Sequence, residues 1–258
     1  MATPPAVEPV WVWGLPLAPL TFQQTLDEIH RLIIAGRPGY FITANLHYAM
    51  LTARDPRLAA VNEKAHFIGA DGMPLVWASR WRTRQLPERV AGSDLVPAIC
   101  EQAAKYGQRV FLLGGAPGIG DEAAAVLRQR FPALQIVGIE SPPFRAPTPE
   151  EHAQLVQRIR DAKTDVLFVA FGQPKGELWL METCEALGVP VGVQIGASLD
   201  FVAGKVQRAP RWIQRIGMEW FYRLSREPGR LLGRYWSNGL FCLRMLARDL
   251  VTGREKRR

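Results

Sequence analysis

Short apolar segments alternate with longer amphipathic segments along most of the chain. The apolar runs are rich in β-branched and aromatic residues, and they predict strands at residues 10–13, 40–43, 66–70, 109–113, 135–139, 165–171 and 190–195. Between them the spacing is helical; one helix is expected after Thr21, a typical capping residue, and another is expected to stop at Gly107. Strands that alternate with helices indicate βαβ units, so the pattern predicts an α/β fold with a parallel sheet flanked by helices. We expect the first run to be an edge strand.

The segment from His66 to Pro74 contains the most informative arrangement of residues. An apolar run is followed by Asp71, then Gly72, and then a proline at the start of a helical pattern. This order predicts that Asp71 follows the carboxyl end of a strand, where open parallel sheets bind ligands. A carboxylate at that edge, beside a glycine that allows close approach, can act as a general base. The alternative is that Asp71 only caps the helix that opens near Met73.

Composition places the chain among ordinary globular proteins. Hydrophobic residues make up 48% and charged residues 22% of its 258 residues. No apolar run approaches the roughly 20 residues needed to cross a bilayer, and we expect no signal peptide at the N-terminus. The three cysteines are scattered, which fits a reducing compartment. The histidines are far apart, so no zinc site is expected.

Positive charge is concentrated at the C-terminal end. Residues 208–258 contain 13 Lys and Arg against 4 Asp and Glu, whereas residues 1–207 contain 19 basic and 20 acidic residues. We therefore divide the chain into a catalytic domain, residues 1–207, and a helical, cationic appendage, residues 208–258. A basic tail on a nearly neutral body predicts that the tail meets a polyanion, a membrane surface or an anionic substrate.

The appendage combines aromatic and basic residues at helical spacing. Trp212, Ile216, Trp220 and Leu224 recur every four residues and predict one apolar face, and Arg223, Arg226, Arg230 and Arg234 predict a basic face that Pro228 interrupts. This composition is typical of a helix at a membrane surface. The alternative is a helix that packs on the body. We expect one face to pack on the body and some aromatic side chains to stay outside. The sequence leaves open whether Trp212, Trp220 and Trp236 pack against the protein or anchor it in a membrane.

An ordered set of motifs now identifies a family. The set comprises Thr43-Ala-Asn45, Ala70-Asp-Gly-Met-Pro74, Arg89-Val-Ala-Gly-Ser-Asp94, a glycine-rich loop at residues 114–120, Phe171-Gly-Gln-Pro-Lys-Gly-Glu-Leu-Trp179, Gly196-Ala-Ser-Leu-Asp-Phe201, Arg208-Ala-Pro-Arg-Trp212 and Gly217-Met-Glu-Trp-Phe-Tyr-Arg-Leu-Ser-Arg-Glu-Pro228. Over residues 11–249 the chain resembles the WecG/TagA/CpsF glycosyltransferases, glycosyltransferase family 26. Each motif alone is weak, but their order is highly specific.

The resemblance implies a Rossmann-like enzyme that moves a sugar from a UDP-sugar to a lipid-diphosphate-linked saccharide, with inversion at the anomeric carbon. It also implies a peripheral protein at the cytoplasmic, inner face of the bacterial cytoplasmic membrane that builds cell-envelope polysaccharide or exopolysaccharide. No nucleic-acid partner is expected, and a homo-oligomer is left open. The sequence does not specify which sugar is transferred.

The resemblance also implies roles for individual residues. Asp71 corresponds to the proposed base, Thr43 and Asn45 lie near the acceptor and donor sugar, and Asp200 lies near the nucleotide. The appendage arginines that correspond best to diphosphate ligands are Arg208, Arg211, Arg215, Arg223 and Arg226. Taken by itself, the pair of Thr43 and Asn45 could instead form the turn that ends a strand.

The chemistry of inverting transfer supports these roles independently. A base must take the proton of the attacking hydroxyl group, and the leaving diphosphate needs cations or helix N-termini to stabilise its charge. The sequence contains no Asp-x-Asp pair of the kind that holds a metal in many sugar-nucleotide enzymes. We therefore expect no metal cofactor, and we expect arginines to grip the diphosphate instead.

Other candidate ligands carry structural alternatives. Arg89 and Asp94 either contact the substrate or form an ion pair, or a helix cap in the case of Asp94. Gly114 and Gly115 belong to a loop that could face a diphosphate or uridine, and Lys175 and Glu177 either contact substrate or begin a solvated helix. Where the family has a glutamine, this chain has Gly176. That contact is either lost or taken over by Gln173 or Gln194.

Parts of the sequence also fit two other functions. A nicotinamide-dependent oxidoreductase would use the glycine-rich loop with Glu140 at the end of the next strand, but the glycine spacing is wrong and no Tyr-x-x-x-Lys pair is present. A polyanion- or RNA-binding protein would use the basic tail, but the neutral α/β body argues against it.

Overall fold

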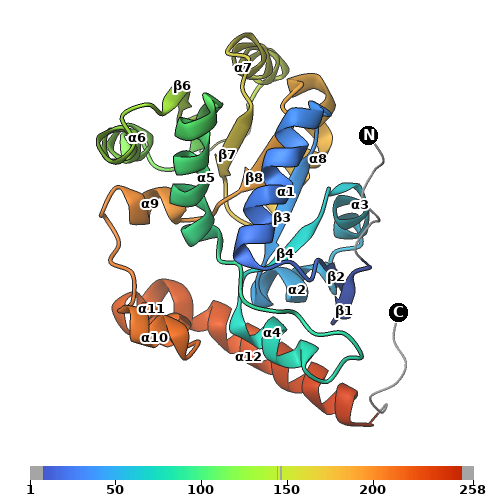
Figure 1. Cartoon of the computed structure of the whole chain (residues 1–258). Helices are drawn as coiled ribbons and strands as arrows, with labels where there is room; N and C mark the ends of the chain where they lie inside the picture. The colour runs from blue at the N-terminus through green and yellow to red at the C-terminus, as the bar shows by residue number, and fades with distance from the viewer. Residues whose placement is uncertain (1–7, 144, 146, 252–258) are drawn as a thin grey trace.

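The computed structural model describes residues 8–143, 145 and 147–251, and it confirms the predicted fold class (Figure 1). Six parallel strands form one sheet in the order β4-β3-β8-β7-β5-β6. These strands are β3 (Tyr40–Ala44), β4 (Ile68–Ala70), β5 (Arg109–Gly114), β6 (Gln135–Glu140), β7 (Val166–Ala170) and β8 (Val191–Gln194). Every predicted strand of the sheet is therefore present within two residues of its expected bounds.

Helices cover both faces of the sheet because side chains of successive strand residues point to opposite faces. One core contains Phe41, Val110 and Phe168, and helices α1 (Phe22–Ala35), α5 (Gly92–Tyr106), α6 (Ile119–Arg130) and α9 (Ser198–Val202) contribute to it. The other contains Ile42 and Leu167, and helices α2 (Leu46–Thr52), α3 (Arg57–Lys64), α7 (Pro149–Asp161) and α8 (Lys175–Leu187) lie on that side. Buried strand residues on both faces explain why the strands read as continuous apolar runs.

Local capping chemistry fixes several helix ends. At α1 the Thr21 hydroxyl accepts from the backbone N–H of Gln24, whose side chain accepts from the N–H of Thr21 in return. At the end of α5, Gly107 has a left-handed backbone with φ of 68°, a conformation that suits glycine. The predicted start after Thr21 and the predicted stop at Gly107 are both confirmed.

The N-terminal segment differs from the prediction. Strands β1 (Val10–Val12) and β2 (Leu15–Leu17) pair with each other in an antiparallel hairpin outside the main sheet. The expected edge strand is present, since β1 pairs with β2 alone, but it belongs to a separate two-stranded sheet. The chain reverses at Trp13 and Gly14, which both have positive φ, and this reversal gives the first strand a partner next to it in sequence. The alternating apolar residues of the hairpin pack into the α8-side core.

Three helices follow residue 208 and gather along one end of the molecule, beside α4 (Met73–Ser79) (Figure 1). These helices are α10 (Arg211–Arg215), α11 (Glu219–Arg226) and α12 (Pro228–Val251). The single apolar face expected from Trp212 to Leu224 is wrong, because Gly217 separates the first two helices. Its φ is 75°, and an added Cβ would lie 2.9 Å from the Cβ of Met73. The chain therefore turns where it touches α4.

Helix α12 has two apolar faces. Its inner face buries Leu231 and Phe241, and its Asp249 accepts hydrogen bonds from the indole N–H of Trp13 and from Arg82. Its outer face exposes a stripe of large apolar side chains, which we call the α12 stripe: Leu232, Trp236, Leu240 and Leu243. The expectation that one face packs and another stays outside is confirmed, and among the described helices none is long and apolar enough to cross a membrane. The division at residue 207 stays a prediction.

Candidate active site at the carboxyl edge of the sheet

The side chains predicted to carry chemistry gather where the parallel strands end. Thr43 is the next-to-last residue of β3, Asp71 follows β4, and Gln194 ends β8. Strand β3 lies between β4 and β8 in the sheet, so these three residues come from adjacent strands. The hydroxyl of Thr43 lies 3.5 Å from the backbone oxygen of Gln194, which ties two of the strand ends together.

Asp71 does not cap the helix that follows it. The N-terminal residue of that helix has no side-chain cap, and Asp71 instead accepts a hydrogen bond of 3.2 Å from the backbone N–H of Gly92, at the start of α5. As a whole residue Asp71 is partly exposed, but protein closely surrounds its carboxylate. Burial raises the pKa of Asp71 to about 6, against the opposing effects of Arg89 and of the Gly92 N–H. A carboxylate with this pKa is ionised at neutral pH and more basic than an ordinary aspartate, as a general base requires.

Thr43 and Asn45 have different surroundings. The Thr43 hydroxyl and the nearer Asp71 carboxylate oxygen lie 3.1 and 3.5 Å from the point where Gly92 would carry a Cβ. Thr43 and Asp71 therefore converge on one small volume that only a glycine leaves open. The side-chain oxygen of Asn45 accepts from the backbone N–H of Tyr48 and caps α2. The turn-forming alternative is thus confirmed for Asn45, whereas its contact with a sugar stays a prediction.

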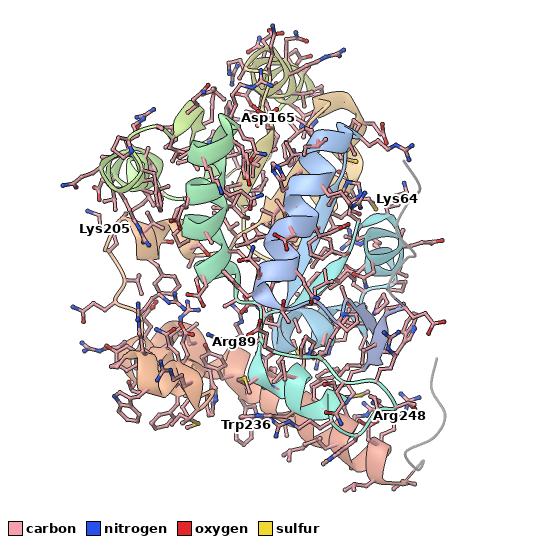
Figure 2. All side chains as sticks on the ribbon, viewed as in Figure 1. Lys64, Arg89, Asp165, Lys205, Trp236 and Arg248 are labelled. Carbon is pink, nitrogen blue, oxygen red and sulfur yellow. The ribbon has the colours of Figure 1, made fainter. Side chains whose placement is uncertain are left out.

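Four alternating charges form a closed ring of ion pairs beside Asp71. Arg89 lies 3.1 Å from Glu219 and 3.7 Å from Asp94, while Arg208 lies 2.5 Å from Asp94 and 3.5 Å from Glu219. We call this set the ion-pair ring. Two of its members come from the β4–α5 region and two from the chain after residue 207. The ring therefore links the α/β body with the C-terminal helices, and Figure 2 labels Arg89 between them. The ion-pair alternative for Arg89 and Asp94 is confirmed, and a ligand role stays a prediction.

A second polar group lies on the α8 side of the same edge. Glu177 is 1% exposed and Gln194 is 3% exposed, and neither the Glu177 Oε2 atom nor either amide atom of Gln194 has a hydrogen-bond partner among the described residues. Gln173 donates from its Nε2 atom to the backbone oxygen of Thr43 at 3.4 Å, and its Oε1 atom is also buried without a partner. Together Gln173, Glu177 and Gln194 form what we call the amide cluster.

The remaining predicted ligands are distributed around this edge. Gly114 and Gly115 form the left-handed turn after β5, where a Cβ on Gly114 would lie 3.0 Å from backbone atoms of Ala170. Lys175 is exposed, which fits the solvated alternative for that residue. Asp200 lies in the first turn of α9 and is partly exposed. The contact of these residues with a nucleotide stays a prediction.

The five appendage arginines are not equivalent. Arg208 and Arg223 both stack on the ring of Phe201, at 5.9 and 5.3 Å from its centroid. Arg226 lies beside Tyr222 in its own helix, and Arg211 and Arg215 are exposed on α10. The structure thus places Arg208 and Arg223 next to the motif at residues 196–201, and the others on the outer surface.

Two residues of the site were missed or misread from sequence. Glu219 is not among the predicted site residues. The signal that could have identified it is its position as an isolated acidic residue in an arginine-rich segment. Glu177 was considered part of a solvated helix start together with Lys175. It is instead buried beneath its helix, and burial raises its pKa to about 7.

The acidic residue that the oxidoreductase alternative requires is paired with an arginine. Glu140, the candidate ribose ligand at the end of β6, forms an ion pair with Arg158, with 2.6 Å between the Nε and Oε1 atoms.

Among the described residues no group of three or more His, Cys, Asp or Glu side chains could hold a metal ion. The expectation that transfer needs no metal stays a prediction.

Comparison with known families agrees with this geometry. The model of the glycosyl transferase WecG/TagA/CpsF family matches residues 10–256, nearly the whole chain. The chain therefore belongs to the WecG/TagA/CpsF family of glycosyltransferases, whose activity requires a sugar donor and an acceptor.

Proposed function

We propose that this member of the WecG/TagA/CpsF family transfers a sugar from a UDP-sugar to a polyprenyl-diphosphate-linked saccharide, with inversion, in the synthesis of cell-envelope polysaccharide or exopolysaccharide. The observation that carries the proposal is the environment of Asp71. Its carboxylate follows a strand of the sheet, belongs to a residue that is partly exposed, and has a pKa raised to about 6 by burial. These are the properties that a base needs to activate a sugar hydroxyl group.

In the proposed reaction, Asp71 accepts the proton of one acceptor hydroxyl as that oxygen attacks the anomeric carbon of the donor. The new carbon–oxygen bond forms on the face opposite the departing group, and the old carbon–oxygen bond breaks with its electron pair going to UDP. The Thr43 hydroxyl lies beside the carboxylate and can position the acceptor hydroxyl for this transfer.

The leaving diphosphate gains negative charge as the bond breaks, and cationic groups must stabilise it. The charge of Arg89 acts on Asp71, the ion-pair ring ties Arg208 to Arg89 through Asp94 and Glu219, and Arg223 lies on the same Phe201 ring as Arg208. Guanidinium groups bind phosphate oxygens through two parallel hydrogen bonds. We assign the diphosphate to this arginine-rich side, where it competes with Asp94 and Glu219 for the arginines.

The lipid-linked acceptor and the α12 stripe suggest the place of the reaction. Trp236, which Figure 2 labels along the border formed by α12, is 70% exposed, and Leu243 is 66% exposed. Exposed arginines accompany these apolar side chains, as in helices that lie at the surface of anionic membranes. We propose that this surface docks on the inner face of the cytoplasmic membrane.

The test is a UDP-release assay over a panel of UDP-sugars, with a polyprenyl-diphosphate-linked saccharide in liposomes. One donor is expected to give UDP release that depends on the acceptor, and the product is expected to have the inverted anomeric configuration by NMR. Turnover with no UDP-sugar, combined with no measurable UDP binding, would contradict the proposal.

A further inference from the structure

The amide cluster contains polar atoms that the protein leaves unpaired in a buried place. Gln194 has two such atoms, and Gln173 and Glu177 have one each. Buried polar groups are almost always hydrogen-bonded, and an unpaired one lowers the stability of the fold. Four unpaired atoms on three neighbouring side chains, at the edge of the sheet that holds Asp71, therefore point to a ligand that completes their hydrogen bonds.

Gly176 makes room for this arrangement. An added Cβ at this position would lie 2.7 Å from the Cδ and 2.8 Å from the Oε1 of Gln194, closer than real contacts allow. The residue lies inside α8 and its backbone is outside the left-handed region, so the glycine is not needed for its conformational freedom. It is needed for space, and the Gln194 carboxamide fills that space.

Gln173 lies between the buried groups and the end of β3. It is partly exposed, its bond to the Thr43 backbone oxygen is long at 3.4 Å, and its side chain also hydrogen-bonds to Glu177. The backbone of Thr43 thus connects the amide cluster with the hydroxyl beside Asp71. Because Gln194 and Glu177 are almost completely buried, a ligand reaches them only if a neighbouring side chain such as that of Gln173 moves.

The unpaired atoms define the chemistry of the ligand. Three of them, on Gln173, Gln194 and Glu177, are oxygens, and the fourth is the Gln194 Nε2 donor. The amide oxygens only accept hydrogen bonds, whereas the Glu177 carboxyl, whose pKa burial raises to about 7, donates when it is protonated and accepts when it is ionised. Hydroxyl groups, which both donate and accept, match this set, whereas a phosphate offers almost only acceptors. We propose that the amide cluster is a subsite for the hydroxyl groups of a sugar ring, and that Gln194 is the residue that determines which sugar fits. The inference rests on the proposed function, because that function supplies two sugars, one on the donor and one on the acceptor.

The test uses the full chain with Gln194→Leu, which keeps the size of the side chain and removes both unpaired atoms. Affinities for UDP, for the UDP-sugar and for the acceptor saccharide are measured by calorimetry, together with KM values and the thermal midpoint. We expect unchanged UDP affinity, an unchanged or raised midpoint, and at least a tenfold loss of affinity for one sugar-bearing ligand. The ligand that loses affinity identifies whether the subsite holds the donor sugar or the acceptor sugar.

Two further variants separate recognition from folding. Gly176→Ala keeps Gln194 in the sequence but displaces its carboxamide. This variant should therefore lower the affinity for the same ligand. Gln108→Leu removes a buried glutamine that bonds to His30 at the amino end of β5, away from the site, and should lower the midpoint without changing sugar affinity. The wild type should bind a deoxy analogue that lacks the recognised hydroxyl more weakly than it binds the parent sugar ligand. Gln194→Leu should bind the two with equal affinity.

The outcomes distinguish this inference from the proposed function. Unchanged affinity for both sugar-bearing ligands in Gln194→Leu would overturn the subsite, and would show that buried water alone pairs the amide atoms. If the wild type transfers no sugar from any UDP donor and binds no UDP, the proposed function fails. The binding measurements still decide the role of Gln194 in that case, because they need no turnover.

Discussion

The two sides of the strand edge satisfy their polar groups in opposite ways. On the α5 side, four charged residues pair with one another in the ion-pair ring, across a separation of more than 100 residues in sequence. On the α8 side, the amide cluster is buried and largely unpaired. Paired charges are held in place by the protein itself and share their arginines with an incoming anion. Unpaired amides make the protein less stable until a ligand binds, so the two sides suit a diphosphate and a sugar respectively.

Asp71 lies on the α5 side but outside the ring, and its substitution should have the largest effect. Asp71→Asn keeps the shape and cannot accept the proton, so kcat should fall by about 10²- to 10⁴-fold in the UDP-release assay. Asp161→Asn changes an exposed aspartate at the end of α7, on the opposite edge of the sheet, and should leave kcat unchanged. Retention of activity in Asp71→Asn would move the base to another residue.

The ring should matter for transfer through its arginines rather than its carboxylates. Arg208→Ala should lower kcat/KM by about 100-fold, since a cation at the developing charge is lost. Asp94→Asn should have a much smaller effect, because it removes only a competitor for that arginine.

Arg109 provides the matched control for this comparison. It forms a similarly half-buried ion pair with Asp165 at the amino end of the sheet. Arg109→Ala should cost stability on the order of 1 kcal/mol and leave kcat/KM unchanged. Equal losses of activity in Arg208→Ala and Asp94→Asn would show that the ring acts only by holding the helices together.

The α12 stripe should affect location more than chemistry. Replacement of Trp236, Leu240 and Leu243 by serine removes apolar area that would enter a bilayer, so binding to anionic liposomes should weaken at least about tenfold. UDP binding should not change. Ile34→Ser, which replaces an equally exposed residue on α1, should not weaken liposome binding. Equal liposome binding by the wild type and the triple variant in a sedimentation assay would contradict membrane docking through α12.

The smallest expected effect is on stability. Because the pKa of Asp71 is raised to about 6 on folding, the folded state binds more protons than the unfolded state between about pH 4 and 6, and stability falls as pH rises through that range. Asp71→Asn removes the buried charge and should raise the free energy of unfolding at pH 8 by about 1 to 3 kcal/mol. At pH 4 the gain should largely vanish. A variant less stable than the wild type at pH 8 in urea denaturation would contradict this account of the pKa.

Much of the fold follows from sequence because its signals are local. The strands and helices of the sheet are marked by apolar runs and by caps such as Thr21, and parallel pairing then brings Asp71 and Thr43 to one edge. The hairpin at residues 10–17 and the break at Gly217 were missed, since both depend on backbone turns and on a contact with Met73 that no periodicity encodes.

The parts of the site that sequence did not predict depend on long-range contacts. Glu219 pairs with Arg89, 130 residues away, and the charge of either residue alone gives no indication of its partner. Glu177 follows an exposed lysine at a helix start, where a glutamate is usually solvated, and only the packing of α8 on the sheet buries it. The contact between Gly176 and Gln194 likewise depends on the packing of α8 on β8, which no local pattern encodes, and the role of Gln194 stays a proposal.

The central claim is that Asp71 is the base, and the pH dependence of transfer tests it most directly. Because kcat/KM follows the ionisation of the free enzyme, the wild-type kcat/KM should fall about tenfold per pH unit below a pKa near 6, the value that burial gives Asp71. The residual rate of Asp71→Asn should not follow this titration. Parallel profiles for both proteins would show that another group controls the reaction and would contradict the account.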